Sequence, residues 1–393
     1  MKKTLYTLMV VVPMVASCAW VKEQTLFQQD QPVAAAEHVA AVPSREGITQ
    51  LWKIDIDQRL LGHTYGYSTP VATDHLVIAG SQDGFARVYR LSDGREKFSI
   101  ALREVCDSGA AQFSNGLIAL ADSAGVLYGI DPEKGTLAWQ YQLSSVLVSA
   151  PIVVGDDILV QTVDNSIYRI SATGEKRWSY TGQPSGLNMY LTASPMLHDN
   201  VIYSVFANGE SVAIDVDSGM LKWRRQLILD PDAAVLSELR APMATPVWLD
   251  KFVLGMQEGV DAVLVAFYQG DLMVLSAKDG SPMISLPISM KTSPVVDGHH
   301  LFVADTEGML QSINLQDGST LWKQKISTRE LSGLTLSGQY LWLTDDEGWV
   351  TRVNLQGEPL GRLKLQGRID RAPVALPDGV LVRSNQGLLT RLQ

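Results

Sequence analysis

The chain is poor in cysteine, histidine and positive charge, and each shortage excludes a class of protein. Its two cysteines cannot form the disulfide framework of a small secreted domain. None of its six histidines has a ligand-like spacing, so we predict no dedicated zinc site. With 32 Lys and Arg against 42 Asp and Glu, the net charge is −10, and such a surface repels nucleic-acid phosphates. We therefore predict no nucleic-acid partner.

Familiar catalytic and cofactor motifs are also missing. The sequence has no Gly-x-Ser-x-Gly, no phosphate-binding loop and no His-Glu-x-x-His. The acidic runs Asp156-Asp157 and Asp345-Asp346-Glu347 lack the oxygen-rich spacing of a calcium loop, so we interpret them as solvated hairpin tips. We predict no metal, cofactor or catalytic residue. Because catalytic groups need not be close in sequence, an enzyme remains the alternative.

Long hydrophobic runs are confined to the amino terminus. Lys2 and Lys3 precede a short apolar segment, which predicts that residues 1–17 are a cleaved export signal. The segment ends in Val15-Ala16-Ser17-Cys18, which resembles the lipobox of bacterial lipoproteins; ordinary secretion is the alternative. The resemblance implies a lipid on Cys18 and, because Ala19 rather than Asp follows, sorting to the outer membrane. Residues 18–46 lack strand alternation and are predicted to be a flexible tether.

From residue 47 to residue 393 the chain repeats a unit of about forty residues. Each unit has an apolar strand, a first turn, a second strand, a second turn, and a third strand that often carries Trp. The first-turn positions are Gly84, Gly125, Asn165, Gly209, Gly270, Gly308, Gly348 and Gly387. The second-turn positions are Gly94, Gly135, Gly174, Gly219, Gly280, Gly318 and Gly357. Four residues after these glycines stand Phe98, Trp139, Trp178, Trp223, Ile284, Trp322 and Gly361.

These markers recur at a nearly constant spacing along the chain and predict an all-β fold. Several hairpins per unit make a four-stranded antiparallel sheet, and dipeptides such as Asp83-Gly84 suit the tight turns. One such sheet cannot bury both faces, so neighbours must stack, and a radial arrangement gives a β-propeller. We predict eight blades, with a seven-bladed ring or a linear solenoid as less favoured alternatives. The last unit stops before its second turn, and residues 47–54 supply the missing strand with Trp52. This predicts that the N-terminal strand completes the last blade.

The repeated residues have a structural interpretation. We predict that the recurring Trp packs between adjacent sheets rather than binding a ligand. Asp131 and Asp215, just before second turns, are predicted to cap those turns. Cys106 is predicted to be a small core residue.

Two adjacent connections are unusually long and apolar. The distance from Trp178 to Pro195 is 17 residues and that from Trp223 to Pro246 is 23, against 12 for the connection that follows Trp139. Long loops on a rigid scaffold commonly bind partners, and an apolar centre is typical of a protein interface. The alternatives are that their apolar residues only cover sheet edges or form extra strands, or that residues 60–67 form the interaction loop. Their apolar residues are Leu187, Met189, Tyr190, Leu191, Leu227, Ile228, Leu229, Val235, Leu236 and Leu239.

The repeat resembles that of pyrroloquinoline-quinone (PQQ) dehydrogenases. Those enzymes carry a vicinal disulfide at the cofactor, and with Cys106 alone in the propeller that pair cannot form here. The chain is more similar to the BamB family of outer-membrane lipoprotein propellers, through its length, its lipobox, and repeats such as Asp215-x-x-x-Gly219-x-x-x-Trp223.

The resemblance to the BamB family implies a non-enzymatic scaffold with its lipid anchor in the outer membrane, on the periplasmic face. It implies binding to the POTRA domains of BamA, with nascent outer-membrane proteins as possible further partners. A PQQ-type quinoprotein or other periplasmic propeller enzyme is the alternative function, and a sugar- or peptidoglycan-binding module is a third.

The same resemblance implies which loop residues bind the partner. In the first long connection the family has two Leu and an Arg; the matching positions here are Leu187, Met189 and Tyr190, so the Arg is replaced by Tyr. In the second it has two Asp, replaced here by Ala241 and Met243. Leu239 and Arg240, immediately upstream, complete the predicted partner-binding set: Leu187, Met189, Tyr190, Leu239, Arg240, Ala241 and Met243.

Overall fold

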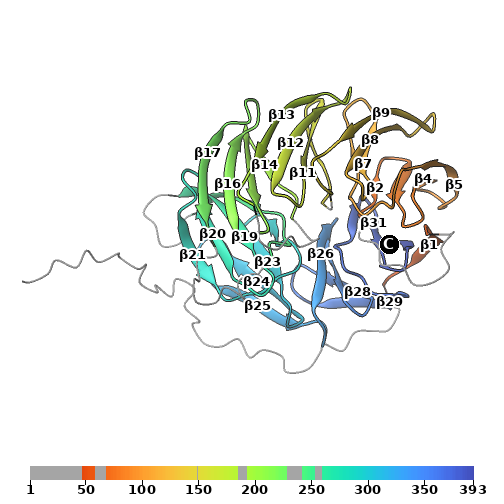
Figure 1. The fold of residues 1–393 in the computed structure, drawn as a ribbon. Coiled ribbons are helices and arrows are strands. Elements are labelled where there is room, and N and C mark those ends of the chain that lie inside the picture. Colours follow the sequence, from red (N-terminus) through yellow and green to blue (C-terminus); the bar gives the residue numbers. More distant parts are fainter. Residues whose placement is uncertain (1–46, 58–67, 148, 185–192, 228–240, 253–258) are drawn as a thin grey trace, which may run out of the picture.

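The structure, a computed structural model, describes residues 47–57, 68–147, 149–184, 193–227, 241–252 and 259–393. Within them, 32 strands form eight four-stranded sheets, and every pair of neighbouring strands is antiparallel. The sheets lie around a ring, in the order of the chain (Figure 1). The predicted eight-bladed propeller is therefore confirmed.

Blades 1 to 4 follow one another from inner to outer strand. Blade 1 is β2 (Val71–Ala72), β3 (Leu76–Gly80), β4 (Phe85–Arg90) and β5 (Glu96–Ala101). Blade 2 is β6 (Ala111–Gln112), β7 (Ile118–Ala121), β8 (Val126–Asp131) and β9 (Thr136–Gln142). Blade 3 is β10 (Ile152–Val154), β11 (Asp157–Gln161), β12 (Ser166–Ser171) and β13 (Lys176–Thr181). Blade 4 is β14 (Met196–His198), β15 (Val201–Val205), β16 (Glu210–Asp215) and β17 (Leu221–Gln226).

Blades 5 to 8 repeat this order. Blade 5 is β18 (Val247–Phe252), β19 (Val260–Ala266), β20 (Leu272–Ser276) and β21 (Pro282–Leu286). Blade 6 is β22 (Val295–Asp297), β23 (His300–Ala304), β24 (Met309–Asn314) and β25 (Thr320–Lys325). Blade 7 is β26 (Leu331–Ser337), β27 (Tyr340–Asp345), β28 (Trp349–Asn354) and β29 (Pro359–Lys364). Blade 8 is β30 (Val374–Leu376), β31 (Gly379–Arg383), β32 (Leu388–Leu392) and β1 (Gln50–Asp55).

The N-terminal strand closes the ring, as the sequence predicts. β1 pairs antiparallel with β32, from Gln50 opposite Leu392 to Asp55 opposite Leu388. Beyond β1, the backbones of Thr49 and Gln393 hydrogen-bond to each other in both directions, at 2.8 and 2.9 Å. In Figure 1 the C-terminus accordingly lies beside β1. Blade 8 thus has four strands although the last repeat supplies only three.

The core is divided among the eight seams between blades. Each cluster of buried apolar side chains joins two neighbouring sheets; one, for example, joins Leu76 and Val88 of blade 1 to Leu120 and Tyr128 of blade 2. The middle strands are buried on both faces, and the outer strands are largely exposed, because only the middle strands face a neighbour on either side. A ring of this kind leaves no sheet face uncovered.

Where an outer strand carries the recurring aromatic, its ring packs on the second-turn glycine of the next blade; the outer strands of blades 5 and 7 have Ile284 and Gly361 at that position. A Cβ on Gly174 would stand 2.8 Å from the Trp139 ring, and one on Gly219 would stand 2.7 Å from the Trp178 ring. The indole Nε1 also donates across the seam, from Trp139 to Ala172 O at 2.7 Å. This confirms that the Trp residues pack between sheets. The same donation joins Trp52 to Leu91, Trp178 to Val216, Trp223 to Ala277 and Trp322 to Leu355.

The predicted turn positions are confirmed with one exception. Asn165, which replaces Gly in the third unit, has a φ of 62°, in the left-handed region that glycine favours. In the fifth unit the residue with positive φ is Gln269 (54°), not Gly270. The sequence misplaces this turn by one residue because Gly270 fits the repeat by type alone.

Asp131 and Asp215 cap their turns as predicted, and Cys106 is fully buried. The prediction that the acidic runs are solvated is wrong for three residues: Asp157, Asp345 and Asp346 are at most 8% exposed. Asp157 is buried because it pairs with Arg169 at 2.7 Å. Asp345 accepts a hydrogen bond from Ser327 Oγ at 2.6 Å, and Asp346 accepts two from Arg329 at 3.1 Å.

Because successive strands of a blade run in opposite directions, the connections between them alternate between two faces of the ring. The face that we call the connection face carries the first turns, such as Gly84, together with the connections from each outer strand to the next blade. The opposite face, the turn face, carries the turns between inner and second strands and the second turns, such as Gly94. The order of strands within each antiparallel sheet requires this separation.

Candidate partner-binding face

The two long connections predicted to bind a partner both start and end on the connection face. One joins β13 to β14 and the other joins β17 to β18, so they belong to blades 3, 4 and 5. Of the predicted residues, Leu187, Met189, Tyr190, Leu239 and Arg240 lie outside the described residues, as do Cys18 and the competing segment 60–67. Ala241 and Met243 are described, together with the points at which both connections enter and leave the sheets.

The ends of the two connections are hydrogen-bonded to each other. Ala193 N donates to Pro242 O at 3.0 Å, which places the residues just before β14 beside those leading to β18. Ala241 then pairs with Tyr268 of the first turn of blade 5: Tyr268 N donates to Ala241 O at 2.8 Å, and Ala241 N donates to Tyr268 O at 3.2 Å. The two long connections are therefore tied to one place on the ring.

Ala241 and Met243 differ in exposure. Ala241 is only 1% exposed, so its side chain does not reach the surface in this structure, and its prediction as a contact residue needs correction. The physical reason is its backbone pairing with Tyr268, which turns the methyl group inward. Met243 is partly exposed and remains on the candidate surface. Ala241 acts as an anchor for the connection rather than as a contact.

The starts of the connections are held by amide and carboxylate side chains that sequence reasoning missed. Gln183 N donates to Glu210 Oε2 at 2.9 Å, and Gln183 O accepts from Asn165 Nδ2 at 2.8 Å and from Asn208 Nδ2 at 3.1 Å. Gln226 Nε2 reaches Asn208 O at 2.6 Å. The first turns of blades 3 and 4 thus hold the start of both connections. Asn165, the one first-turn position without Gly, was the available signal.

Paired charges lie on the connection face of blades 5 to 7, beside the ends of the two long connections. Lys291 lies 4.9 Å above the Tyr268 ring and pairs with Glu330. Arg329 makes two hydrogen bonds to Asp346, and these bonds raise the pKa of its guanidinium. Since these charges are already matched within the chain, they suit the polar rim of an interface better than a substrate site.

Among the described residues, no three His, Cys, Asp or Glu side chains are grouped as metal ligands. Cys106 is a free thiol, buried, and burial raises its pKa to about 12. Nowhere in the described ranges does a helix have the length and apolar character needed to cross a membrane.

Known proteins resemble the chain in both sequence and fold. The family model described as outer membrane protein assembly factor BamB matches residues 104–324. The outer membrane protein assembly factor BamB of Yersinia pestis is 21% identical over 404 residues, covering 98% of each chain. The crystal structure of BamB from Moraxella catarrhalis has a TM-score of 0.74 at 21% identity, covering 88% of this chain and 99% of that one.

An enzyme shares the architecture as well. Quinohemoprotein alcohol dehydrogenase from Comamonas testosteroni has a TM-score of 0.68 at 13% identity, covering 88% of this chain and 76% of that one. At that identity the likeness concerns the fold alone, whereas the family model spans more than half of this sequence. The chain belongs to the outer membrane protein assembly factor BamB family.

Proposed function

We propose that the protein is a non-enzymatic scaffold that is anchored by a lipid on Cys18 at the periplasmic face of the outer membrane. In this proposal the connection face of blades 3 to 5 binds the POTRA domains of BamA, and the complex assists the folding and insertion of outer-membrane β-barrel proteins. The observation that carries the proposal is the hydrogen bond from Ala193 N to Pro242 O, which brings two long apolar connections to one place. Family membership supports the same function.

Rigid support of the connections favours a binding role. The backbone bonds of Ala241 to Tyr268, and the side-chain bonds to Gln183, fix the ends of both connections. Fixed ends reduce the conformational entropy that a loop loses when it binds, so more of the contact energy appears as affinity. The apolar residues of the predicted set supply the desolvated centre, and the paired charges near Lys291 and Arg329 supply the rim.

Two departures from the family pattern shape the partner surface. The family's Arg is Tyr190 here, and its two Asp are Ala241 and Met243. A partner that pairs with this chain therefore needs fewer charges and more apolar surface opposite Tyr190 and Met243, whereas the buried Ala241 makes no such contact. We propose that the BamA of the same cell carries that compensating change.

Binding is tested with a soluble form that lacks the signal and carries Cys18→Ser, titrated with the POTRA domains of its own BamA. Leu187→Glu together with Leu239→Glu places charges in the proposed contact, and each should cost about 2 kcal/mol or more of binding. The matched control is Leu321→Glu, an exposed Leu (44%) on the outer strand of blade 6. Failure of the unaltered protein to bind, or equal binding by the double variant and the control, would exclude this interface.

The anchor is tested separately in cells. Mass spectrometry of the mature N-terminus should find acyl chains on Cys18, and the Cys18→Ser protein should leave the outer-membrane fraction. Recovery of unlipidated, membrane-free protein from the unaltered gene would remove this part of the proposal without affecting the binding test.

The alternative, an enzyme with a quinone cofactor, is supported only by the shared fold. Within the propeller, Cys106 is the single cysteine, so the vicinal disulfide of PQQ dehydrogenases cannot form. Absorbance and mass spectrometry of the native protein decide between the two functions, since a bound quinone would favour the enzyme.

A further inference from the structure

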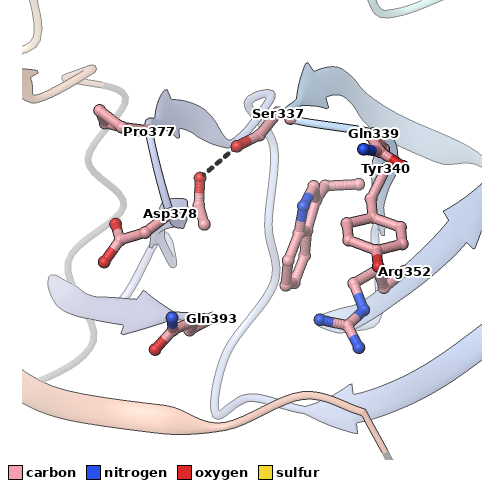
Figure 2. Close-up of a pocket in the computed structure, with 10 residues that line it drawn as sticks. Ser337, Gln339, Tyr340, Arg352, Pro377, Asp378 and Gln393 are labelled. Carbon is pink, nitrogen blue, oxygen red and sulfur yellow. Dashed lines mark hydrogen bonds between the residues drawn. The ribbon is translucent and has the colours of Figure 1, made fainter.

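A pocket of about 390 Å³ opens on the turn face at the seam between blades 7 and 8, away from the long connections. Its walls come from the turn between β26 and β27 and from the turn between β30 and β31. Figure 2 shows Tyr340 and Arg352 on one side of it, with Pro377, Asp378 and Gln393 on the other. The volume falls in the range of small-molecule sites, about 300–1,000 Å³.

The two turns are fixed relative to each other. The Ser337 hydroxyl lies 2.7 Å from Leu376 O and 2.8 Å from Gly379 O, so blade 7 is joined to the turn of blade 8 (Figure 2). Gln393, on the same side as Asp378, is held by its backbone hydrogen bonds to Thr49. The pocket is therefore a preformed part of the ring.

Arg352 is the cation of this pocket that has no carboxylate partner. Among the residues that the structure describes, it forms no ion pair within 4.0 Å. Its guanidinium lies instead 4.8 Å from the Tyr340 ring centroid and 5.6 Å from that of Trp342. Gly47 lies behind it: a Cβ there would stand 2.9 Å from Arg352 Nη2. Two rings and a main chain thus hold the planar guanidinium in place, an arrangement that suits recognition of a planar anion.

Two buried donors in the same wall lack an acceptor. Trp342 is 1% exposed, and within the described residues neither its indole Nε1 nor Arg352 Nε has a hydrogen-bond partner. Leaving a buried donor unpaired is unfavourable. Both nitrogens are shielded from solvent, so a ligand in the pocket has to approach the guanidinium at its outer edge, through the Nη atoms.

The other charged side chain at the pocket is already matched. Asp378 accepts a hydrogen bond from Arg391 Nη2 at 2.8 Å, so this ion pair adds little net charge. Arg352 then makes the wall it occupies positive. Because Tyr340 and Pro377 add exposed apolar surface, an anion with an organic body fits better than a bare inorganic ion.

We propose that the pocket between blades 7 and 8 is a carboxylate-binding site in which the Arg352 guanidinium receives the two carboxylate oxygens. The aromatic wall contacts the body of the ligand. The carboxylate belongs either to a free organic acid or to an acidic side chain of a polypeptide. This site is independent of the interface on the connection face, because it lies on the opposite face of the ring.

Indole NMR of the full soluble chain, with Cys18→Ser, tests the proposal. The Nε1–H signal of Trp342, assigned by Trp342→Phe, reports on a ring that lies against the guanidinium. The protein is titrated at constant ionic strength with glutarate, with the neutral analogue glutaramide, with inorganic phosphate, and with a blocked Ala-Glu-Ala peptide. Arg352→Gln removes the proposed anchor. Arg95→Gln, an exposed Arg on the same face, is the matched control for loss of charge.

We expect a saturable shift of the Trp342 signal with glutarate and none with glutaramide. Arg352→Gln should weaken binding at least about tenfold, because the charge-assisted hydrogen bonds to the carboxylate are lost, and Arg95→Gln should leave it unchanged. Tighter binding of the peptide than of glutarate identifies a polypeptide source, and weaker binding identifies a free acid.

Three results would overturn the proposal: no saturable shift, equal binding of glutaramide, or tighter binding of phosphate. Undiminished binding by Arg352→Gln would overturn it as well. If that variant does not fold, Arg352→Lys keeps the charge and loses the planar fork, and it should still bind more weakly.

Discussion

The indole Nε1 of Trp52 donates a 2.8 Å hydrogen bond to Leu91 O, across the seam between blade 8 and blade 1. The same oxygen accepts Arg391 Nη1 at 2.8 Å. The ring of Trp52 also lies 3.0 Å from the position that a Cβ on Gly94 would occupy. The first strand, the last strand and blade 1 therefore meet at one carbonyl group, and this contact closes the ring.

Removing the Trp52 ring should weaken the closure strongly. We expect Trp52→Ala to lower the free energy of unfolding by about 3–5 kcal/mol, because a large buried ring and its hydrogen bond are lost. Trp52→Phe keeps most of the packing and should cost about 1 kcal/mol. Urea unfolding measures both. Trp139→Phe, which loses the equivalent bond to Ala172, is the matched control. A Trp52→Ala protein as stable as the unaltered one would contradict closure by β1.

A methyl group on Gly174 should separate blades 2 and 3. Its φ is +83°, and a Cβ would stand 2.8 Å from the Trp139 ring. Gly155 has a φ of +58° with nothing within 4 Å, so Gly155→Ala carries only the backbone strain of about 1–2 kcal/mol. Gly174→Ala should cost about 1–3 kcal/mol more than this control, by denaturant unfolding. Equal losses of stability in Gly174→Ala and Gly155→Ala would show that the packing between blades 2 and 3 adjusts to the methyl group without cost.

Alkaline pH should destabilise the fold partly through Cys106. Burial raises the pKa of this thiol from 9.0 to about 12, so above pH 9 the unfolded state loses a proton that the folded state keeps. The contribution is complete below pH 9 and is lost as the pH rises towards 12, by about 1.4 kcal/mol per pH unit. Cys106→Ala should therefore show a shallower fall in stability between pH 9 and 11. If the unaltered protein and Cys106→Ala lose stability equally steeply with pH, Cys106 does not contribute to the alkaline loss.

Tyr128 adds to the same loss of stability at alkaline pH, since burial raises its pKa to about 12.

The Cys106 thiol should also resist a thiol reagent at pH 8 in the folded protein with Cys18→Ser. It should react once urea unfolds the protein, because the thiolate is the reactive form.

The buried pair of Arg87 and Asp83 should be costly to break from one side. Both side chains are 2% exposed, and Arg87 Nε also donates to Ile56 O at 2.8 Å. Arg87→Met leaves the Asp83 carboxylate without its main partner and should cost about 3–5 kcal/mol. Arg87→Met with Asp83→Asn should recover part of that loss. Urea unfolding of the two single variants and the double variant measures the coupling, and strict additivity would show that the two residues act independently.

The sequence predicts the architecture well because its main determinants are local. The second-turn glycines have positive φ, and in five of the seven units the residue four positions later is an aromatic, which in blades 2 and 3 packs on the second-turn glycine of the following blade. The same regularity explains the single misplaced turn: Gly270 has the expected type, yet Gln269 adopts the positive φ. Residue type alone does not fix which of two neighbours takes the strained conformation.

Features made by distant residues could not be found in this way. Asp157 looks like a loop residue until Arg169 of the next strand is placed beside it. Ala241 looks like a contact until its pairing with Tyr268 turns it inward. The pocket beside Arg352 requires two turns from successive units to be brought together, and no motif marks that meeting.

The swap that completes blade 8 also sets an order of events in time. β1 is made before the other strands of the propeller, but its partner β32 is made after them. Until Leu392 arrives opposite Gln50, one edge strand has nothing to pair with, and the other blades can form only an open arc. Joining ends so far apart adds only a modest entropic cost, since that cost grows with the logarithm of length. The ring can therefore close only after β32 has been made and has met β1.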